Sequence, residues 1–287
     1  MINNEDTKAQ LKIPILFSKM RIFFKTAIWV AGILGGIYLV ICGYLYFNQE
    51  ALIFPGTKLP RGYTYNFQLP FTEYAIKTND RDTLNACLFK ATSPKGLIFY
   101  LHGNGGNLQS WGTVAAYYTS LGYDLFMADY PGYGKSTGHI TSLQQLFNAV
   151  GAAYAFIKPN YPENHIIILG YSIGTGPAAW LASKNHPQKL VLLAPYYSLS
   201  DLVQKTYPFV PAFILKYNIN TYKYIQQVAA PITIFHGDAD EVIYYGSSLK
   251  LKRYFKREDT LITLHGQPHN GIDENSDYLA GLKDILQ

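Results

Sequence analysis

One long run of apolar residues stands apart from the rest of the chain. Residues 27–47, AIWVAGILGGIYLVICGYLYF, carry no charge, and as a helix rising about 1.5 Å per residue they would span roughly the 30 Å hydrocarbon core of a bilayer. Trp29 lies near one end, Tyr44 and Tyr46 lie at the other, and basic residues precede the run, as is typical of a membrane helix. We predict an uncleaved anchor, because a signal peptide has a shorter apolar core that ends at a small-residue cleavage site. A lipoprotein would use Cys42, but Ile41 is too large for the position before it.

Beyond residue 72 the pattern changes to short apolar runs that alternate with longer amphipathic stretches. Residues 48–72 are rich in Pro, Gly and aromatics and predict a linker packed on the following domain, 73–287. Two alternating segments, 73–78 and 84–90, predict an antiparallel pair with a turn at 79–82. The later strands are expected at 96–101, 123–128, 165–169, 189–194, 232–236 and 260–264, and the helices at 108–121, 142–157, 175–184, 246–254 and after Asn270.

Strands that alternate with helices indicate βαβ units. We therefore expect an α/β fold with a mostly parallel eight-stranded sheet and helices on both faces. The aromatic segment at 196–227 is expected to be irregular, since Pro208 and Pro211 prevent a long helix there.

Charge and cysteine content narrow the function classes. Of the net charge of +5, a surplus of three lies within residues 1–25, which hold five Lys or Arg and two Asp or Glu. Residues 1–26 thus form a basic tail, expected on the cytoplasmic side, and the nearly neutral remainder has no nucleic-acid footprint. Two cysteines exclude a disulfide framework.

Candidate chemistry centres on Gly170-Tyr171-Ser172-Ile173-Gly174. This G-x-S-x-G sequence lies between a predicted strand and a predicted helix, as a nucleophile elbow does, and it nominates Ser172 as the nucleophile. A serine nucleophile needs a base and an orienting carboxylate. Two clusters follow later strands, GDADEV at 237–242 and HGQPHN at 265–270, and the carboxyl ends of parallel strands share one edge of the sheet.

Together these motifs resemble membrane-anchored serine hydrolases of the α/β-hydrolase superfamily, in the branch that includes depalmitoylase-like abhydrolase-domain proteins and serine-aminopeptidase-like hydrolases. The resemblance covers residues 74–287 and rests on HGN at 102–104, DYPGYGKS at 129–136, GYSIG at 170–174, HGDADEVI at 236–243 and PHN at 268–270.

The resemblance implies the α/β-hydrolase fold, with residues 196–227 forming a short cap. It also implies that Asp240 is the acid and His269 the base, with backbone N–H groups of Asn104 and Ile173 forming the oxyanion hole. The rival acids are Asp238, Glu241 and Asp201, and the rival base is His265. We interpret Asp129 and His102 as structural supports of their loops. Phe209, Phe213 and Ile214 either wall an acyl pocket or seat the cap on the core.

We expect an enzyme that cleaves carboxylic esters or thioesters of acyl or lipid-like substrates through an acyl-enzyme. A serine peptidase or acyltransferase with the same triad is the alternative. A binding scaffold would lack a triad residue, and dehalogenases and epoxide hydrolases need aspartate in place of Ser172.

No metal-ligand spacing or phosphate loop is present in the sequence, so neither a metal nor a cofactor is expected. The expected partners are a small-molecule or acylated substrate and the membrane, with no nucleic acid. The catalytic domain is expected beyond the membrane, and the lack of N-x-S/T sequons favours a bacterial periplasmic face.

Overall fold

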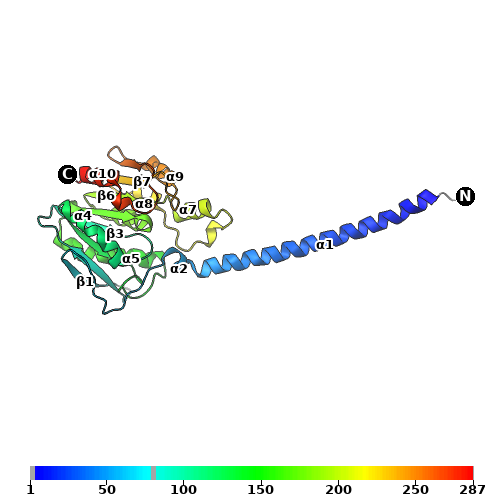
Figure 1. Cartoon of the computed structure of the whole chain (residues 1–287), viewed down its shortest axis with the longest axis horizontal. Coiled ribbons are helices and arrows are strands. Elements are labelled where there is room, and N and C mark those ends of the chain that lie inside the picture. Colours follow the sequence, from blue (N-terminus) through cyan, green and yellow to red (C-terminus); the bar gives the residue numbers. More distant parts are fainter. Residues whose placement is uncertain (1–3, 79–81, 287) are drawn as a thin grey trace. The chain divides into compact units, whose positions relative to one another are not determined.

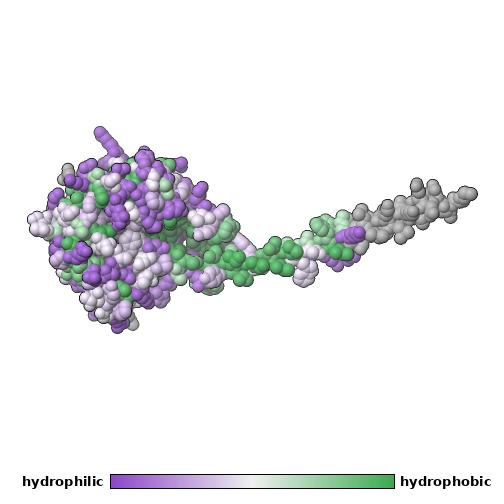
Figure 2. Space-filling view, in the orientation of Figure 1, coloured by the Kyte–Doolittle hydropathy of each residue, from purple (hydrophilic) through white to green (hydrophobic). Residues whose placement is uncertain are grey.

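The computed structural model describes residues 4–78 and 82–286, with side chains from residue 19 onward. It divides into two units, Met1–Asn48 and Gln49–Gln287. The first unit is formed by one helix, α1 (Asn4–Phe47), whose stretch Lys19–Phe47 is long and apolar enough to cross a membrane. Figure 2 shows much of this stretch as hydrophobic surface. The predicted anchor, 27–47, lies inside this helix, which begins farther upstream than the apolar run.

The second unit is built on one eight-stranded sheet with the order β1-β2-β4-β3-β5-β6-β7-β8 (Figure 1). β2 is antiparallel to both β1 and β4, and all pairs from β4 through β3 to β8 are parallel. The predicted, mostly parallel eight-stranded sheet is thereby confirmed, while most of the turn predicted at 79–82 lies outside the described residues. The strands are β1 (Phe71–Lys77), β2 (Thr83–Phe89), β3 (Gly96–Leu101), β4 (Tyr123–Ala128), β5 (Ile166–Tyr171), β6 (Lys189–Leu193), β7 (Ile232–Gly237) and β8 (Thr260–Leu264).

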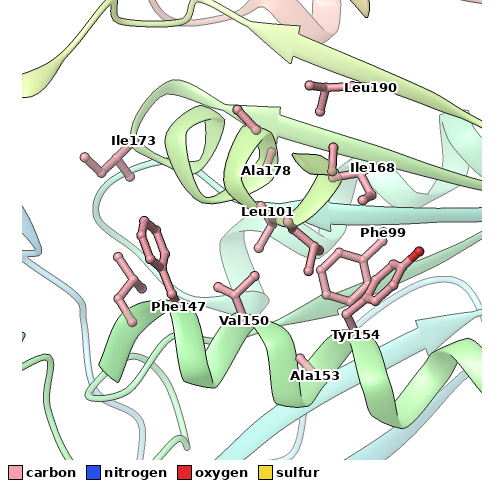
Figure 3. Packing of buried hydrophobic residues seen from close by; sticks show 14 of the residues in the cluster. Phe99, Leu101, Phe147, Val150, Ala153, Tyr154, Ile168, Ile173, Ala178 and Leu190 are labelled. Carbon is pink, nitrogen blue, oxygen red and sulfur yellow. The ribbon is translucent and has the colours of Figure 1, made fainter. Parts of the chain in front are cut away.

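Both faces of the sheet are buried, which explains why the central strands β3 and β5 carry no charged side chain. In β3, Phe99 packs on one face with α5 and α6, and Tyr100 packs on the other with α4 and α10. Figure 3 shows the first of these layers, where Phe147, Val150 and Tyr154 of α5 project toward the sheet. The main covering helices are α4 (Ala115–Ser120), α5 (Leu143–Ile157), α6 (Thr175–Ser183), α9 (Gly246–Leu251) and α10 (Ser276–Ile285).

Two predicted segments differ in detail from the structure. The helix expected at 108–121 is divided into α3 (Leu108–Trp111), a 3₁₀ turn (Gly112–Val114) and α4. Gly112 explains the break: a side chain there would come within 2.5 Å of the Phe67 ring, and glycine is a poor helix former. The segment expected to be irregular contains α7 (Leu199–Thr206) and α8 (Thr221–Ile225) with a 3₁₀ turn (Ala212–Ile214) between them.

The first residues of the second unit are ordered against the rest of that unit. It begins with α2 (Gln49–Ile53), which is not evident from its Pro- and Gly-rich surroundings. Thr57 N–H then donates to Gly106 O, and Leu59 N–H donates to Gly134 O. These bonds place the segment along the loops that follow β3 and β4, at the edge of the sheet where the site residues lie.

Candidate active site

Ser172 lies in a sharp turn between β5 and α6. Its backbone φ of 53° is in the left-handed region, which non-glycine residues seldom adopt without a functional reason. A side chain at Gly170 would meet Ala178 at 2.6 Å, and one at Gly174 would meet Leu101 O at 2.2 Å. The close approach of α6 and β3 to this turn therefore requires glycine on both sides of the serine.

Three side chains from three different loops converge at this turn. His269 Nε2 lies 2.9 Å from Ser172 Oγ, and His269 Nδ1 lies 2.7 Å from Asp240 Oδ2. A carboxylate only accepts hydrogen bonds, so His269 Nδ1 carries the proton and Nε2 offers its lone pair to the serine hydroxyl. All three side chains are buried. The arrangement can remove a proton from Ser172 and stabilise the imidazolium that forms.

Asp240 is held by more than its contact with His269. Its Oδ1 accepts hydrogen bonds from Val242 N–H and Ile243 N–H at 2.9 and 2.7 Å. Burial opposes its ionisation, but the hydrogen bonds from His236 and His269 and from the Ile243 N–H outweigh this and hold the pKa of Asp240 well below its ordinary value. The carboxylate is therefore charged throughout the physiological pH range.

His236 and Tyr171 support the three residues Ser172, His269 and Asp240. The sequence analysis did not single out either of them. His236 Nε2 lies 2.8 Å from Ile243 O and 3.2 Å from Asp240 Oδ2, while Ser248 Oγ meets its Nδ1 at 2.6 Å. Because carbonyl and carboxylate oxygens only accept, Nε2 carries the proton and donates to Ile243 O, with Asp240 Oδ2 as the second, longer acceptor. Tyr171 O–H donates to His269 O, and the two rings stack with centroids 5.8 Å apart. The sequence signal that could have identified His236 is its position near the end of β7.

The two residues expected at the oxyanion hole both line the cavity above Ser172. Ile173 is in the first turn after the elbow, where backbone N–H groups have no partner within the helix. Asn104 follows β3, and its side-chain oxygen accepts from Gly105 N–H. The contribution expected of Asn104 is therefore its backbone N–H, since its amide oxygen shapes the turn.

His102 and Asp129 form a buried support beneath the same loop. Asp129 Oδ1 accepts from Leu108 N–H at 2.9 Å, and Ser136 O–H donates to the Asp129 carbonyl oxygen. Burial raises the pKa of the Asp129 carboxyl to about 8 and lowers the pKa of His102 to about 4. Neither group reaches Ser172 through a hydrogen bond in the described structure, which agrees with a structural interpretation.

The rival residues are engaged elsewhere. Asp238 pairs with His265, whose side chain is exposed, and Asp201 pairs with Lys250 and accepts from Tyr244 O–H. Glu241 is exposed at the cavity, and its carboxylate accepts from the backbone N–H of His269 at 3.5 Å and not from the imidazole. The structure therefore brings Asp240 and His269 to Ser172 and leaves the alternatives outside this contact.

A cavity of about 560 Å³ opens above Ser172. Aliphatic side chains form much of its wall, together with Trp111, Tyr171, Tyr196 and Tyr207. The predicted pocket residues do not form this wall: Phe209 and Phe213 are 63% and 88% exposed, and Ile214 is not in contact with the cavity. The reason is that amphipathic α7 turns Leu199, Leu202 and Val203 toward the cavity, whereas Pro208 and Phe209 after it are exposed. The aliphatic lining consists of Leu52, Ile53, Ile173, Leu199, Leu202, Val203, Leu215, Val242 and Ile243.

Comparison with known proteins agrees with this architecture. A family described as "Serine aminopeptidase, S33" matches residues 92–224. Alpha/beta hydrolase domain-containing protein 17B of Homo sapiens is 33% identical over 214 residues, which cover 70% of each chain. The 17C protein of Mus musculus is 30% identical over 232 residues, which cover 76% of this chain and 69% of that one.

Solved structures show the same fold. An esterase of Pyrococcus furiosus aligns with a TM-score of 0.65 at 18% identity and covers 81% of this chain and 97% of its own. A Xanthomonas campestris protein described as an α/β serine hydrolase without a lid aligns with a TM-score of 0.55 at 15% identity, covering 78% and 95%. The chain is therefore an α/β-hydrolase enzyme and belongs to the family of alpha/beta hydrolase domain-containing protein 17.

Proposed function

We propose that this protein is a membrane-anchored serine hydrolase that cleaves carboxylic esters or thioesters with an acyl chain. The observation that carries the proposal is the continuous contact from Ser172 through His269 to Asp240 at the base of an aliphatic cavity. Nucleophile, base and orienting acid are each within hydrogen-bonding distance of the next, as acyl transfer requires.

The reaction follows from this geometry. His269 Nε2 takes the proton of Ser172, and the serine oxygen attacks the substrate carbonyl. The backbone N–H groups of Asn104 and Ile173 receive the negative charge that develops on the carbonyl oxygen. His269 then protonates the leaving alkoxide or thiolate, and a water that the same histidine deprotonates releases the acid and restores Ser172.

The lining of the cavity supports an acyl substrate. Removing apolar surface from water is favourable by roughly 25 cal/mol per Å². The aliphatic wall therefore binds a hydrocarbon chain more favourably than a charged group. A peptidase or acyltransferase would use the same three residues and would differ only in the leaving group or acceptor.

The anchor sets the side of the membrane on which the proposed enzyme would act. Helix α1 would hold the chain in a bilayer with residues 1–26 in the cytoplasm, because the basic residues precede the apolar stretch. The catalytic unit would then lie on the far side, and in a bacterium it would face the periplasm. Its substrate would be presented at or near that membrane surface.

The test is fluorophosphonate labelling of the full chain in membranes beside Ser172→Ala, followed by a panel of esters, thioesters and amides of increasing chain length. We expect labelling of the wild type, none of the variant, and faster turnover of esters and thioesters than of amides. A membrane-impermeant probe applied to sealed vesicles of known orientation tests the side. Labelling that persists in Ser172→Ala would refute the proposal, and faster turnover of amides would favour the peptidase.

A further inference from the structure

Helix α2 is fastened to the segment that follows α7. The buried Gln49 side chain donates from Nε2 to Ile214 O at 2.7 Å, and its Oε1 accepts from Lys216 N–H at 2.8 Å. One amide thus satisfies two backbone groups that lie two residues apart. These bonds hold the start of the catalytic unit against residues 207–216 of the cap.

The two fastened segments also form part of the cavity wall. Leu52 and Ile53 of α2 line the cavity together with Tyr207 and Leu215 from the cap. Phe54 is buried next to them, with its ring edge-on to Tyr217 at 5.3 Å between centroids. The residues that follow the apolar helix therefore take part in shaping the substrate site.

Chain length limits how far this wall can be from a bilayer. Phe47 is the last residue of α1, and Leu52 follows it by five positions. Five residues reach at most about 18 Å when fully extended. If α1 spans a membrane, the wall of the cavity at Leu52 is within that distance of the point where the helix ends.

The outer surface of the same segments is apolar and is flanked by positive charge. Residues 206–215, TYPFVPAFIL, have no charged side chain and lie between Lys205 and Lys216. We name Leu52, Tyr207, Phe209 and Phe213 the rim patch; Leu52 and Tyr207 are 51% and 53% exposed, and the two phenylalanines still more. Figure 2 shows hydrophobic surface over the segment after α7.

Exposed aromatic side chains beside lysines are typical of segments that sit at the membrane–water interface, and an exposed apolar patch of this kind marks an interaction surface. We propose that the rim patch seats in the interfacial layer of the bilayer that holds the anchor, so that an acyl chain passes from the lipid into the cavity without crossing water. This inference rests on the anchored acyl hydrolase proposed above and adds the surface that delivers its substrate. It also gives Phe209 and Phe213 a role outside the cavity.

The first test measures insertion without using activity. The full chain carrying Cys42→Ser and Phe213→Cys is labelled with an environment-sensitive fluorophore and reconstituted in phosphatidylcholine vesicles with phosphatidylglycerol. Cys87 is buried and stays unlabelled. Leu249→Cys in the same background is the matched control, because Leu249 is 48% exposed on α9 and does not line the cavity.

We expect blue-shifted emission that spin-labelled lipids quench at position 213, and water-like emission at 249. Water-like emission at both positions would overturn the inference. A third outcome is a blue shift at 213 that lipid spin labels do not quench and that disappears when the protein is diluted in the vesicles. This outcome would assign the patch to a second copy of the chain and would also overturn the inference.

The second test separates delivery from chemistry. Phe209→Ser/Phe213→Ser is compared with Leu249→Ser on a long-chain ester dispersed in the same vesicles and on a short water-soluble ester. We expect kcat/KM of the double variant to fall about tenfold on the vesicle substrate, which corresponds to ~1.4 kcal/mol, with no change on the short ester and none in Leu249→Ser.

An equal loss on both substrates, or a loss on neither, would contradict the role of the patch. If the wild type hydrolyses no ester while the label at 213 is quenched by lipid, the proposed hydrolase function fails and the membrane contact stands. The two proposals can therefore fail independently.

Discussion

Replacing Asp240 by asparagine tests the acid with the smallest change in shape. Asp240 Oδ1 accepts from Val242 N–H and Ile243 N–H, so the amide oxygen of asparagine must occupy this position. The amide NH₂ then takes the place of Oδ2, which faces His269 Nδ1 at 2.7 Å and His236 Nε2 at 3.2 Å.

An NH₂ group only donates hydrogen bonds. His269 would therefore satisfy it by exposing the Nδ1 lone pair and moving its proton to Nε2, the nitrogen that lies 2.9 Å from Ser172 Oγ. A protonated, neutral Nε2 cannot accept the serine proton. The loss of the correct tautomer together with the carboxylate charge is worth about 10⁴ in kcat in a Ser-His-Asp triad, which corresponds to about 5 kcal/mol of transition-state stabilisation.

The assay is turnover of a short soluble ester and the rate of fluorophosphonate labelling, each with the full chain in detergent or membranes. Asp238→Asn is the matched control, because this aspartate lies in the same loop and pairs with the exposed His265; we expect its activity to stay within about threefold of the wild type. Thermal unfolding of both variants checks that the loss is chemical.

Retention of more than about a tenth of the activity in a folded Asp240→Asn variant would refute the assignment. In that case Asp201→Asn and Glu241→Gln become the informative variants. A loss of activity in either of them, with Asp240→Asn active, would move the orienting acid to that residue.

Two further variants test the support around the site. Because burial raises the pKa of Asp129 to about 8, compared with about 4 in an unfolded chain, the native state holds more protons between these pH values, and the free energy of unfolding falls as pH rises through this window. Asp129→Asn should therefore flatten the fall of stability toward pH 8 in denaturant titrations, and an unchanged slope would contradict the raised pKa. Gly174→Ala places a methyl group 2.2 Å from Leu101 O, so we expect a destabilisation of about 2 kcal/mol and the loss of fluorophosphonate labelling; an active variant with wild-type melting behaviour would show that the elbow can relax.

Elements with a local physical signal can be read from the amino-acid sequence alone. The apolar run at 27–47 meets the length criterion for a membrane span without reference to any other part of the chain. The central strands are recognisable because both of their faces are buried, and Ser172 is recognisable because a tight strand-to-helix turn requires Gly170 and Gly174. Parallel strands also bring their carboxyl ends to one edge, which made the clusters after β7 and β8 candidates for the partners of the serine.

Which members of those clusters meet depends on how the loops pack in three dimensions. Asp238 and Asp240 are two residues apart and identical in chemistry, yet one turns to His265 and the other to His269, because the backbone N–H groups of Val242 and Ile243 orient the Asp240 carboxylate. His236 acquires its role through contacts with Asp240, four residues later, and with Ser248 of α9, and its place near the end of β7 does not by itself predict them.

The pocket wall depended on tertiary structure for the same reason. Apolarity alone did not distinguish Phe209 and Phe213, which face outward, from Leu202 and Val203, which line the cavity. The direction of α7 and the bonds of Gln49 to the cap made that choice. Local patterns specify helices, strands and turns, whereas the direction in which a side chain points from a loop is set by contacts between segments distant in the sequence.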